Sequence, residues 1–167
     1  MKVLVIGNGG REHALAWKLK ESKSVDKIYM ARGNGGTEDF CENLDIDPTD
    51  IEKLLAFAVE NEIDLTVVGP EDPLCAGIVD AFNEKGLRVF GPNKACARFE
   101  KSKEFTKIFL EKYSIPTAKY KSFESYEHAE KGLEEFSYPL VVKADGLCFG
   151  KGVIICQDRD EAVDALE

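Results

Sequence analysis

Short apolar runs alternate with amphipathic stretches over the first 90 residues, and glycine clusters follow the first two runs. The run at 2–6 precedes Gly7-Asn8-Gly9-Gly10, and the run at 27–31 precedes a second cluster at 33–37. A helical stretch at 11–20 lies between them. Repeated strand–helix units predict a parallel sheet covered on both faces. Ligands of such sheets bind beyond the carboxyl ends of the strands, where these glycines lie.

The pattern continues to residue 90. Apolar residues of a helix predicted at 48–62 recur at the spacing of one helix face. These residues are Ile51, Leu54, Leu55, Ala58 and Val59. Asp47 is expected to cap this helix, with Pro48 in its first turn. A strand at 64–69, a helix at 72–85 and a strand at 87–90 complete the first part of the chain.

The rhythm changes at Gly91-Pro92-Asn93. One long helix is expected next, with Phe99, Thr106 and Phe109 on one stripe. An extended segment at 117–123, a helix at 126–136, strands at 140–144 and 152–156 around a glycine loop, and a helix at 159–167 follow. A domain boundary is therefore expected near residue 101, which leaves a shorter second unit.

The charge balance narrows the classes of partner. Acidic residues outnumber basic residues by 31 to 22, and the formal net charge is −9. This balance argues against general binding to nucleic acid or to a membrane surface. Five cysteines without a C-x-x-C pair and two histidines favour neither a disulfide framework nor a zinc site, and fit a reducing cytoplasm. No apolar run approaches the roughly 20 residues of a membrane span.

The first glycine loop allows more than one ligand. Gly7 and Gly9 fit the dinucleotide pattern G-x-G-x-x-G, but its third glycine falls on Glu12, whose carboxylate would oppose a pyrophosphate. Arg32, where NAD-binding proteins carry an acidic residue, leaves NADP as an alternative. The amides at the start of the following helix can hold one phosphate. A tight turn without any ligand is the other interpretation.

Two later segments carry polar residues suited to binding. Glu71 and Asp72 could accept hydrogen bonds from sugar hydroxyls, and Asp72 could also cap the next helix. The loop at 145–152 lacks the spacing and the Ser/Thr of a Walker A motif, but a glycine-rich hairpin with one lysine can close over nucleotide phosphates. Lys143, on an apolar strand, is expected to need an anionic partner. Lys103 alone is typical of a solvated helix residue.

Five separated motifs together resemble the phosphoribosylamine–glycine ligase family, also called glycinamide ribonucleotide synthetases, of the ATP-grasp superfamily. They are Gly7-Asn8-Gly9-Gly10-Arg11-Glu12-His13-Ala14, Gly33-Asn34-Gly35-Gly36-Thr37, Gly69-Pro70-Glu71-Asp72-Pro73-Leu74, Gly91-Pro92 and Val142-Lys143-Ala144-Asp145-Gly146-Leu147. The resemblance implies an α/β fold: a Rossmann-like, phosphoribosylamine-binding domain at 1–101, then the incomplete start of an ATP-grasp α+β domain at 102–167.

The resemblance also implies a function: ATP-dependent ligation of glycine to phosphoribosylamine through a glycyl phosphate, in purine biosynthesis. The small-molecule substrates are then phosphoribosylamine, glycine and ATP, with Mg²⁺. The residues expected to bind phosphoribosylamine are Gly9, Gly10, Arg11, Glu12, Glu71 and Asp72. Those expected to contact ATP are Lys103, Lys143, Gly146, Gly150, Lys151 and Gly152.

No residue is assigned to catalysis, and His13 is expected to be a packing or hydrogen-bonding residue more often than a base. Proteins of this family are considerably longer, and their Mg²⁺ ligands are expected beyond residue 167. The chain alone is therefore expected to be an inactive fragment. Another ATP-grasp ligase and a non-catalytic nucleotide-binding module are the alternatives.

Overall fold

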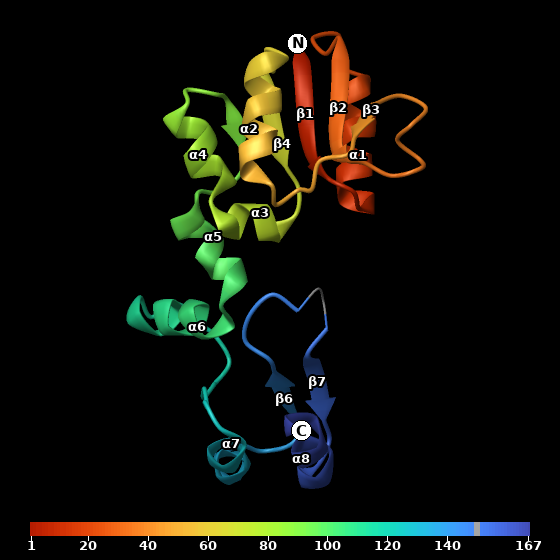
Figure 1. Cartoon of the computed structure of the whole chain (residues 1–167). Helices are drawn as coiled ribbons and strands as arrows, with labels where there is room; N and C mark the ends of the chain where they lie inside the picture. Colours follow the sequence, from red (N-terminus) through yellow and green to blue (C-terminus); the bar gives the residue numbers. More distant parts are fainter. Residues whose placement is uncertain (149–150) are drawn as a thin grey trace. The chain divides into compact units, whose positions relative to one another are not determined.

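A five-stranded parallel sheet forms the first of the two units into which the chain divides, Met1–Arg98 and Phe99–Glu167. The computed structural model describes residues 1–148 and 151–167. The sheet order is β3-β2-β1-β4-β5 (Figure 1). Its strands are β1 (Lys2–Gly7), β2 (Lys27–Arg32), β3 (Glu42–Leu44), β4 (Leu65–Val68) and β5 (Val89–Phe90).

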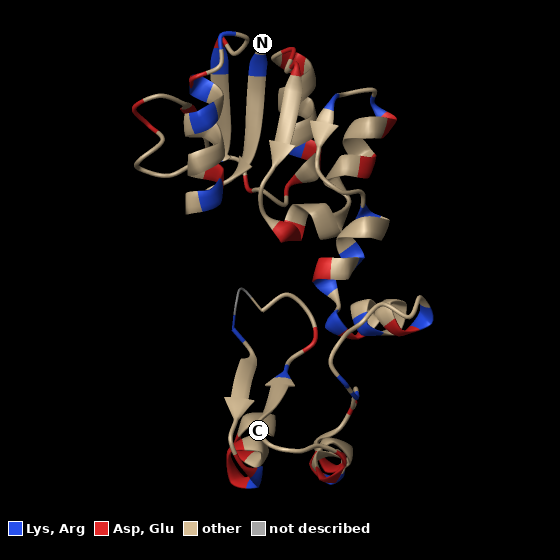
Figure 2. Cartoon of the chain, turned by 180° about the vertical axis from the view of Figure 1, so that it is seen from behind, with Lys and Arg blue, Asp and Glu red and all other residues tan. Residues whose placement is uncertain are grey.

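The central strand β1 pairs with β2 on one edge and with β4 on the other. Val3 and Val5 pack with Ala16 of α1 (Gly10–Lys20) on one face of the sheet. Successive side chains of a strand point to opposite faces, so the buried Leu4 and Ile6 face the other layer. Figures 1 and 2 show α1 on one face and α2 (Ile51–Glu60) on the other. The predicted parallel sheet with two covered faces is confirmed.

The start of α2 differs from the prediction. Asp50 caps the helix by accepting a hydrogen bond from the Lys53 amide at 3.2 Å. Asp47 instead accepts the amide of Thr49 at 2.9 Å, in a turn that brings Asp50 to the helix start. The prediction that Asp47 caps the helix was wrong. Val59 is 58% exposed, because it lies about 100° around the helix from the buried Ala58.

The helix expected at 72–85 is two helices, α3 (Glu71–Ala76) and α4 (Ile78–Glu84). Gly77 separates them with a φ of 103°, which a residue with a side chain rarely adopts. Pro70 occupies the cap position of α3, so the interpretation of Asp72 as a cap was wrong. The short edge strand β3 was not expected.

Within residues 99–148 and 151–167, the second unit contains a two-stranded antiparallel sheet, three complete helices and a short 3₁₀ turn. The long helix expected after residue 93 is broken at Ser102 into α5 (Lys94–Lys101), which spans the division between the units, and α6 (Lys103–Lys112). Ser102 breaks the helix because its hydroxyl accepts the Phe105 amide at 3.0 Å, which starts a new helix. The remaining elements are α7 (Tyr126–Gly132), the 3₁₀ turn η1 (Leu133–Glu135), β6 (Leu140–Lys143), β7 (Val153–Cys156) and α8 (Arg159–Leu166).

The core of this unit lies on one face of the β6–β7 sheet. Leu133, Cys156 and Ala162 are buried there, and Leu140 and Val142 pack against them. Over residues 1–148 and 151–167, no helix combines the length and the apolar character that a membrane crossing requires.

Candidate functional site

Two loops meet at the carboxyl edge of the parallel sheet, one after β1 and one after β4. After β1 the chain builds the sheet outward through β2 and β3, and it then returns to place β4 on the other edge of β1. This is the topological switch point at which open α/β sheets bind ligands. The amide of Gly69 donates to the Ile6 carbonyl at 3.1 Å, so the two loops start from adjacent backbone.

Arg11 ties these two loops together. Its Nη1 donates to the Gly69 carbonyl at 2.7 Å, and both Nη1 and Nη2 lie 3.2 Å from Oε1 of Glu71. The ion pair is partly exposed, with 59% of the arginine side chain and 38% of the glutamate side chain accessible. The structure thus brings Arg11 and Glu71 together at the edge of the sheet, beside the start of α1.

Glu12 lies beneath the loops. Its side chain is buried, and Oε2 accepts the amide of Gly9 at 2.8 Å. A Cβ at Gly69 would lie 2.2 Å from Oε1, and one at Gly7 would lie 2.4 Å from Cγ of Glu12. Both glycines are therefore needed to make room for this carboxylate, which fills the space below the loops and fixes their shape.

The start of α1 leaves space for an anion. Gly9 occupies the N-cap position, and the helix begins at Gly10. Among the described residues, no atom lies within 4 Å of a Cβ built at Gly10, so this surface is open. The first amides of an α-helix lack partners within the helix and carry its positive dipole end. Gly10, together with Arg11, therefore forms a surface suited to one phosphate group.

The second glycine loop supports the first. Asn34 Nδ2 donates to the Asn8 carbonyl at 3.0 Å, and the buried Thr37 hydroxyl donates to the Asn34 carbonyl at 2.8 Å. His13 packs between this loop and Phe40, since a Cβ at Gly36 would lie 2.6 Å from its Cε1. This placement favours the packing role expected for the histidine. Arg32, at the end of β2, forms an ion pair with Asp45 at 3.4 Å.

In the second unit, Lys103 reaches the glycine loop. Its Nζ donates to the Gly146 carbonyl at 2.9 Å. The loop is closed at its base by the Ala144 amide, which donates to the Gly152 carbonyl at 2.8 Å, and Lys151 lies just inside that closure. Lys103 of α6 thus contacts the hairpin loop that contains Gly146, Lys151 and Gly152. Gly150 lies outside the described residues.

Asp145 holds this hairpin to the start of α6, a role that was not predicted. Its carboxylate accepts hydrogen bonds from Ser102, Lys103 and Glu104. Burial raises the pKa of Asp145, but the hydrogen bonds from the Glu104 and Lys103 amides and the Ser102 hydroxyl outweigh this and hold it below the usual range. The only signal in the sequence is an aspartate before a glycine at the end of a strand, and this pattern does not predict which residues the aspartate contacts.

Lys143 is exposed, so the burial that led us to expect an anionic partner is absent, and the expected contact with a phosphate stays a prediction. It shares the outer face of the sheet with Val141, opposite Val153 and Ile155. In the part of the chain that the structure describes, no layer covers this face: Val141 is 47% and Ile155 63% exposed. Among the same residues, no carboxylate forms an ion pair with Lys143.

Charge is unevenly spread over the second unit. The charged side chains of α7 and α8 are mostly acidic, whereas lysines lie at the start of α6, at the end of β6 and in the loop that follows (Figure 2). These lysines are Lys103, Lys143 and Lys151. Their grouping around one glycine loop suits a ligand with several negative charges.

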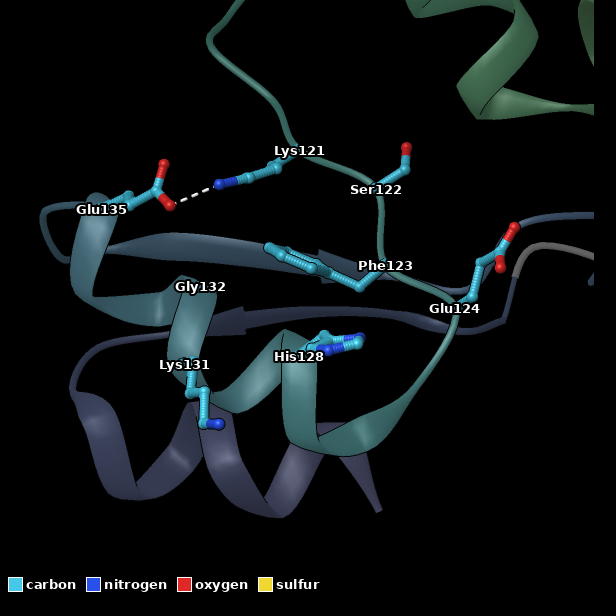
Figure 3. Close-up of a pocket in the computed structure, with 8 residues that line it drawn as sticks. All are labelled: Lys121, Ser122, Phe123, Glu124, His128, Lys131, Gly132 and Glu135. Carbon is cyan, nitrogen blue, oxygen red and sulfur yellow. Dashed lines mark hydrogen bonds and ion pairs between the residues drawn. The ribbon is translucent and has the colours of Figure 1, made fainter.

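A separate pocket of about 410 Å³ lies between the segment at 121–124 and α7 (Figure 3). The ring of Phe123 packs on Gly132, where a Cβ would lie 2.0 Å from Cζ. Lys121 forms an ion pair with Glu135 across one end. Its lining residues are Lys121, Ser122, Phe123, Glu124, His128, Lys131, Gly132 and Glu135. None of the predicted site residues lines this pocket.

Comparisons with family models and with curated proteins point to the same family. The family "Phosphoribosylglycinamide synthetase, N domain" matches residues 1–100, and "Phosphoribosylglycinamide synthetase, ATP-grasp (A) domain" matches residues 101–167. The phosphoribosylamine–glycine ligase of Clostridium acetobutylicum is 53% identical over 169 residues, covering 100% of this chain and 40% of that protein. That of Pasteurella multocida is 54% identical over 169 residues, with coverages of 100% and 39%.

A comparison with solved structures points to the same family. The crystal structure of the phosphoribosylamine–glycine ligase of Thermotoga maritima matches with a TM-score of 0.76 at 32% identity, covering 98% of this chain and 38% of that one. The N5-carboxyaminoimidazole ribonucleotide synthetase of Thermotoga maritima matches with a TM-score of 0.72 at 20% identity, over 98% of this chain and 42% of that one, and shares the fold. The chain thus spans about two fifths of the length of the curated relatives it matches.

Proposed function

The chain belongs to the phosphoribosylglycinamide synthetase family, and from this we propose that it contributes to the ATP-dependent ligation of glycine to 5-phosphoribosylamine. The products are glycinamide ribonucleotide, ADP and phosphate, and the reaction belongs to purine biosynthesis. We assign residues 1–101 to binding phosphoribosylamine and residues 102–167 to the beginning of an ATP-grasp domain. The site suits a soluble, cytoplasmic enzyme of small-molecule metabolism.

The observation that carries this proposal is the Arg11 bridge at the switch point of the sheet. Arg11 joins the loops after β1 and β4 beside the open start of α1. The amides of the first turn of α1, from Gly10 onward, with the Arg11 guanidinium, would hold the phosphate of phosphoribosylamine, since the Gly9 amide already donates to Glu12. Glu71 and Asp72 then lie where ribose hydroxyls or the amine could donate hydrogen bonds. Glu12 would act from below, by fixing the shape of the loop.

The second unit would bind the phosphates of ATP. Lys103 and Lys143, with Lys151 and the backbone of Gly146 and Gly152, would offset the negative charge of the phosphate groups. Gly150 would belong to the same loop. In an acyl-phosphate route, ATP phosphorylates the glycine carboxylate, and the amine then attacks the glycyl phosphate. Fixed positive charge lowers the barrier of such a phosphoryl transfer, and a closing glycine loop shields the labile intermediate from water.

Magnesium ions bound with ATP would offset the negative charge of its phosphates. Across residues 1–148 and 151–167, no three His, Cys, Asp or Glu side chains gather as metal ligands. We therefore assign the metal to none of the described residues, and the lysines of the glycine loop supply the charge that this chain itself contributes.

Binding of ribose 5-phosphate to the purified chain tests the substrate site. Arg11→Met should weaken binding at least tenfold, since hydrogen bonds to charged groups contribute about 1.5–3 kcal/mol. Arg88→Met is the matched control, because Arg88 Nε also donates to a backbone carbonyl, that of Asp64, at 2.8 Å, but at the amino edge of β4. Calorimetry measures both variants, with ATP and NADPH as further ligands.

The control should bind ribose 5-phosphate as the wild type does. Equal affinity in the Arg11→Met variant and the wild type would remove the arginine from the site. A different result would be that the wild type binds NADPH but not ribose 5-phosphate, and that Arg11→Met abolishes this binding. The site would then be assigned to a dinucleotide.

A further inference from the structure

One carboxylate closes the N-terminus of α6. Asp145 Oδ1 accepts the Lys103 amide at 2.6 Å and the Glu104 amide at 3.3 Å, and Oδ2 accepts the Ser102 hydroxyl at 3.0 Å. The Ser102 hydroxyl in turn accepts the Phe105 amide at 3.0 Å. The first three amides of α6 are thus already paired with protein oxygens, so this helix start offers no free donors to a phosphate.

A second bond links the same two segments. The Lys103 side chain crosses to the glycine loop, where its Nζ donates to the Gly146 carbonyl at 2.9 Å. Lys103 therefore holds residue 145 through its backbone and residue 146 through its side chain. Together these bonds close a ring between the start of α6 and the base of the loop.

This ring restricts two groups that would otherwise move. A lysine side chain loses much of its rotamer freedom when it is ordered, and glycine-rich backbone loses more conformational freedom than any other. Gly146 has a φ of 100°, which residues with a side chain rarely adopt, so the loop base depends on a glycine and on its flexible backbone. Because Asp145 and Lys103 order these groups before a ligand arrives, less of that cost falls on binding.

The carboxylate suits this role electrostatically. Burial raises the pKa of Asp145, but the hydrogen bonds that its carboxylate accepts from the backbone amides and from the Ser102 hydroxyl outweigh this effect and hold the pKa below the usual range. The carboxylate therefore stays ionised at neutral pH and keeps its hydrogen bonds. The positive charge of Lys103 remains available, since the acceptor of its ammonium is a neutral carbonyl.

We propose that Asp145 is a positioning residue that fixes Lys103 and the base of the glycine loop in one arrangement, ready to receive the phosphates of a nucleotide. The proposal rests on the nucleotide-binding role proposed for the second unit. Asp145 would touch neither the nucleotide nor glycine, and would act through Lys103 and Gly146.

Titration of the purified chain with ADP, followed by amide NMR, tests the proposal. Asp145→Ala should raise the dissociation constant at least tenfold. Asp145→Asn should recover most of that loss, because its amide oxygen can still accept the Lys103 amide. The matched control is Asp158→Ala, since Asp158 caps α8 by accepting the Glu161 amide at 3.0 Å and, among the described residues, forms no hydrogen bond or ion pair with the loop. It should bind ADP as the wild type does.

Amide exchange separates this proposal from the function on which it rests. The Lys151 amide donates to the Cys148 carbonyl, and the Ala144 amide donates to the Gly152 carbonyl, both at 2.8 Å. Exchange at Lys151 and Ala144 should rise at least tenfold in Asp145→Ala and stay unchanged in Asp158→Ala. If the wild type does not bind ADP, the nucleotide role fails, and these exchange rates still decide whether Asp145 positions the loop.

Three results would overturn the proposal. One is ADP affinity in Asp145→Ala equal to that of the wild type. Another is an equal loss of affinity in Asp145→Ala and the Asp158→Ala control, which would indicate a general effect of helix capping. The third is unchanged exchange at Lys151 and Ala144. Should Asp145→Ala fail to fold, the ADP affinity of Asp145→Asn is compared with that of the wild type and of Lys103→Met. A loss of affinity in Asp145→Asn as large as that in Lys103→Met would also refute the proposal.

Discussion

The space between Gly69 and Glu12 can be tested by adding one methyl group. In Gly69→Ala, the new Cβ would lie 2.2 Å from Oε1, 2.4 Å from Cγ and 2.6 Å from Cδ of Glu12. The whole end of the glutamate must then move. It cannot do so freely, because it is buried and its Oε2 accepts the Gly9 amide.

The expected loss of stability follows from these contacts. Overpacking a filled site costs about 1–3 kcal/mol, and losing a helix-capping hydrogen bond costs about 1 kcal/mol. Replacing glycine by alanine returns about 0.4–1 kcal/mol by restricting the unfolded chain. The net expectation for Gly69→Ala is a loss of about 2 kcal/mol. Gly10→Ala is the matched control, since a Cβ there has open space and alanine favours the helix, and it should gain up to about 1 kcal/mol.

Urea unfolding followed by tryptophan fluorescence measures both variants. Trp17 is the only tryptophan and lies in α1, so the signal reports on the first unit. A double-mutant cycle with Glu12→Ala adds a second test, because removing the glutamate side chain should abolish the penalty of Gly69→Ala. The reasoning fails if Gly69→Ala is as stable as Gly10→Ala, or if the penalty persists without the glutamate.

Three further outcomes are expected. Burial raises the pKa of the Cys41 thiol to about 11, so at pH 8 the exposed Cys96 should react with a disulfide reagent before Cys41, and equal rates would contradict this. Gly132→Ala should destabilise the second unit by about 1–3 kcal/mol in thermal unfolding, because the methyl group would overlap the Phe123 ring; an unchanged transition would show that the ring moves freely. The pKa of Asp145 is lower in the folded chain, so its stabilising effect is present above the unfolded pKa and is lost as the pH falls through the folded value, below about pH 4. Asp145→Asn should remove this part of the acid dependence, and an identical acid profile would refute it.

The sheet could be predicted because its buried strands are continuous apolar runs. The edge strand β3 could not, since Glu42–Leu44 is short and has no apolar pattern. The breaks at Gly77 and Ser102 escaped prediction for a different reason. An apolar stripe continues across each break, and periodicity does not register a change in the direction of a helix axis.

The site residues also differ in how far the sequence could predict them. Arg11 and Glu71 could be expected together, because glycine loops at the ends of neighbouring strands meet at one edge of a sheet. The exposure of Lys143 could not be predicted, since alternation along a strand distinguishes two faces without saying which one is covered. The role of Asp145 depends on partners more than forty residues earlier in the chain, which only the folded arrangement brings near.

The central position of β1 has a consequence for synthesis of the protein on the ribosome. This strand emerges before its two partners, which emerge far apart: β2 is complete at Arg32 and β4 only at Val68. An unpaired strand edge is a template for pairing with another chain. At roughly 5–20 residues per second of translation, one edge of β1 stays open for on the order of seconds after β2 has joined. The strand that is most deeply buried in the finished unit is therefore the one whose edge the nascent chain must protect the longest.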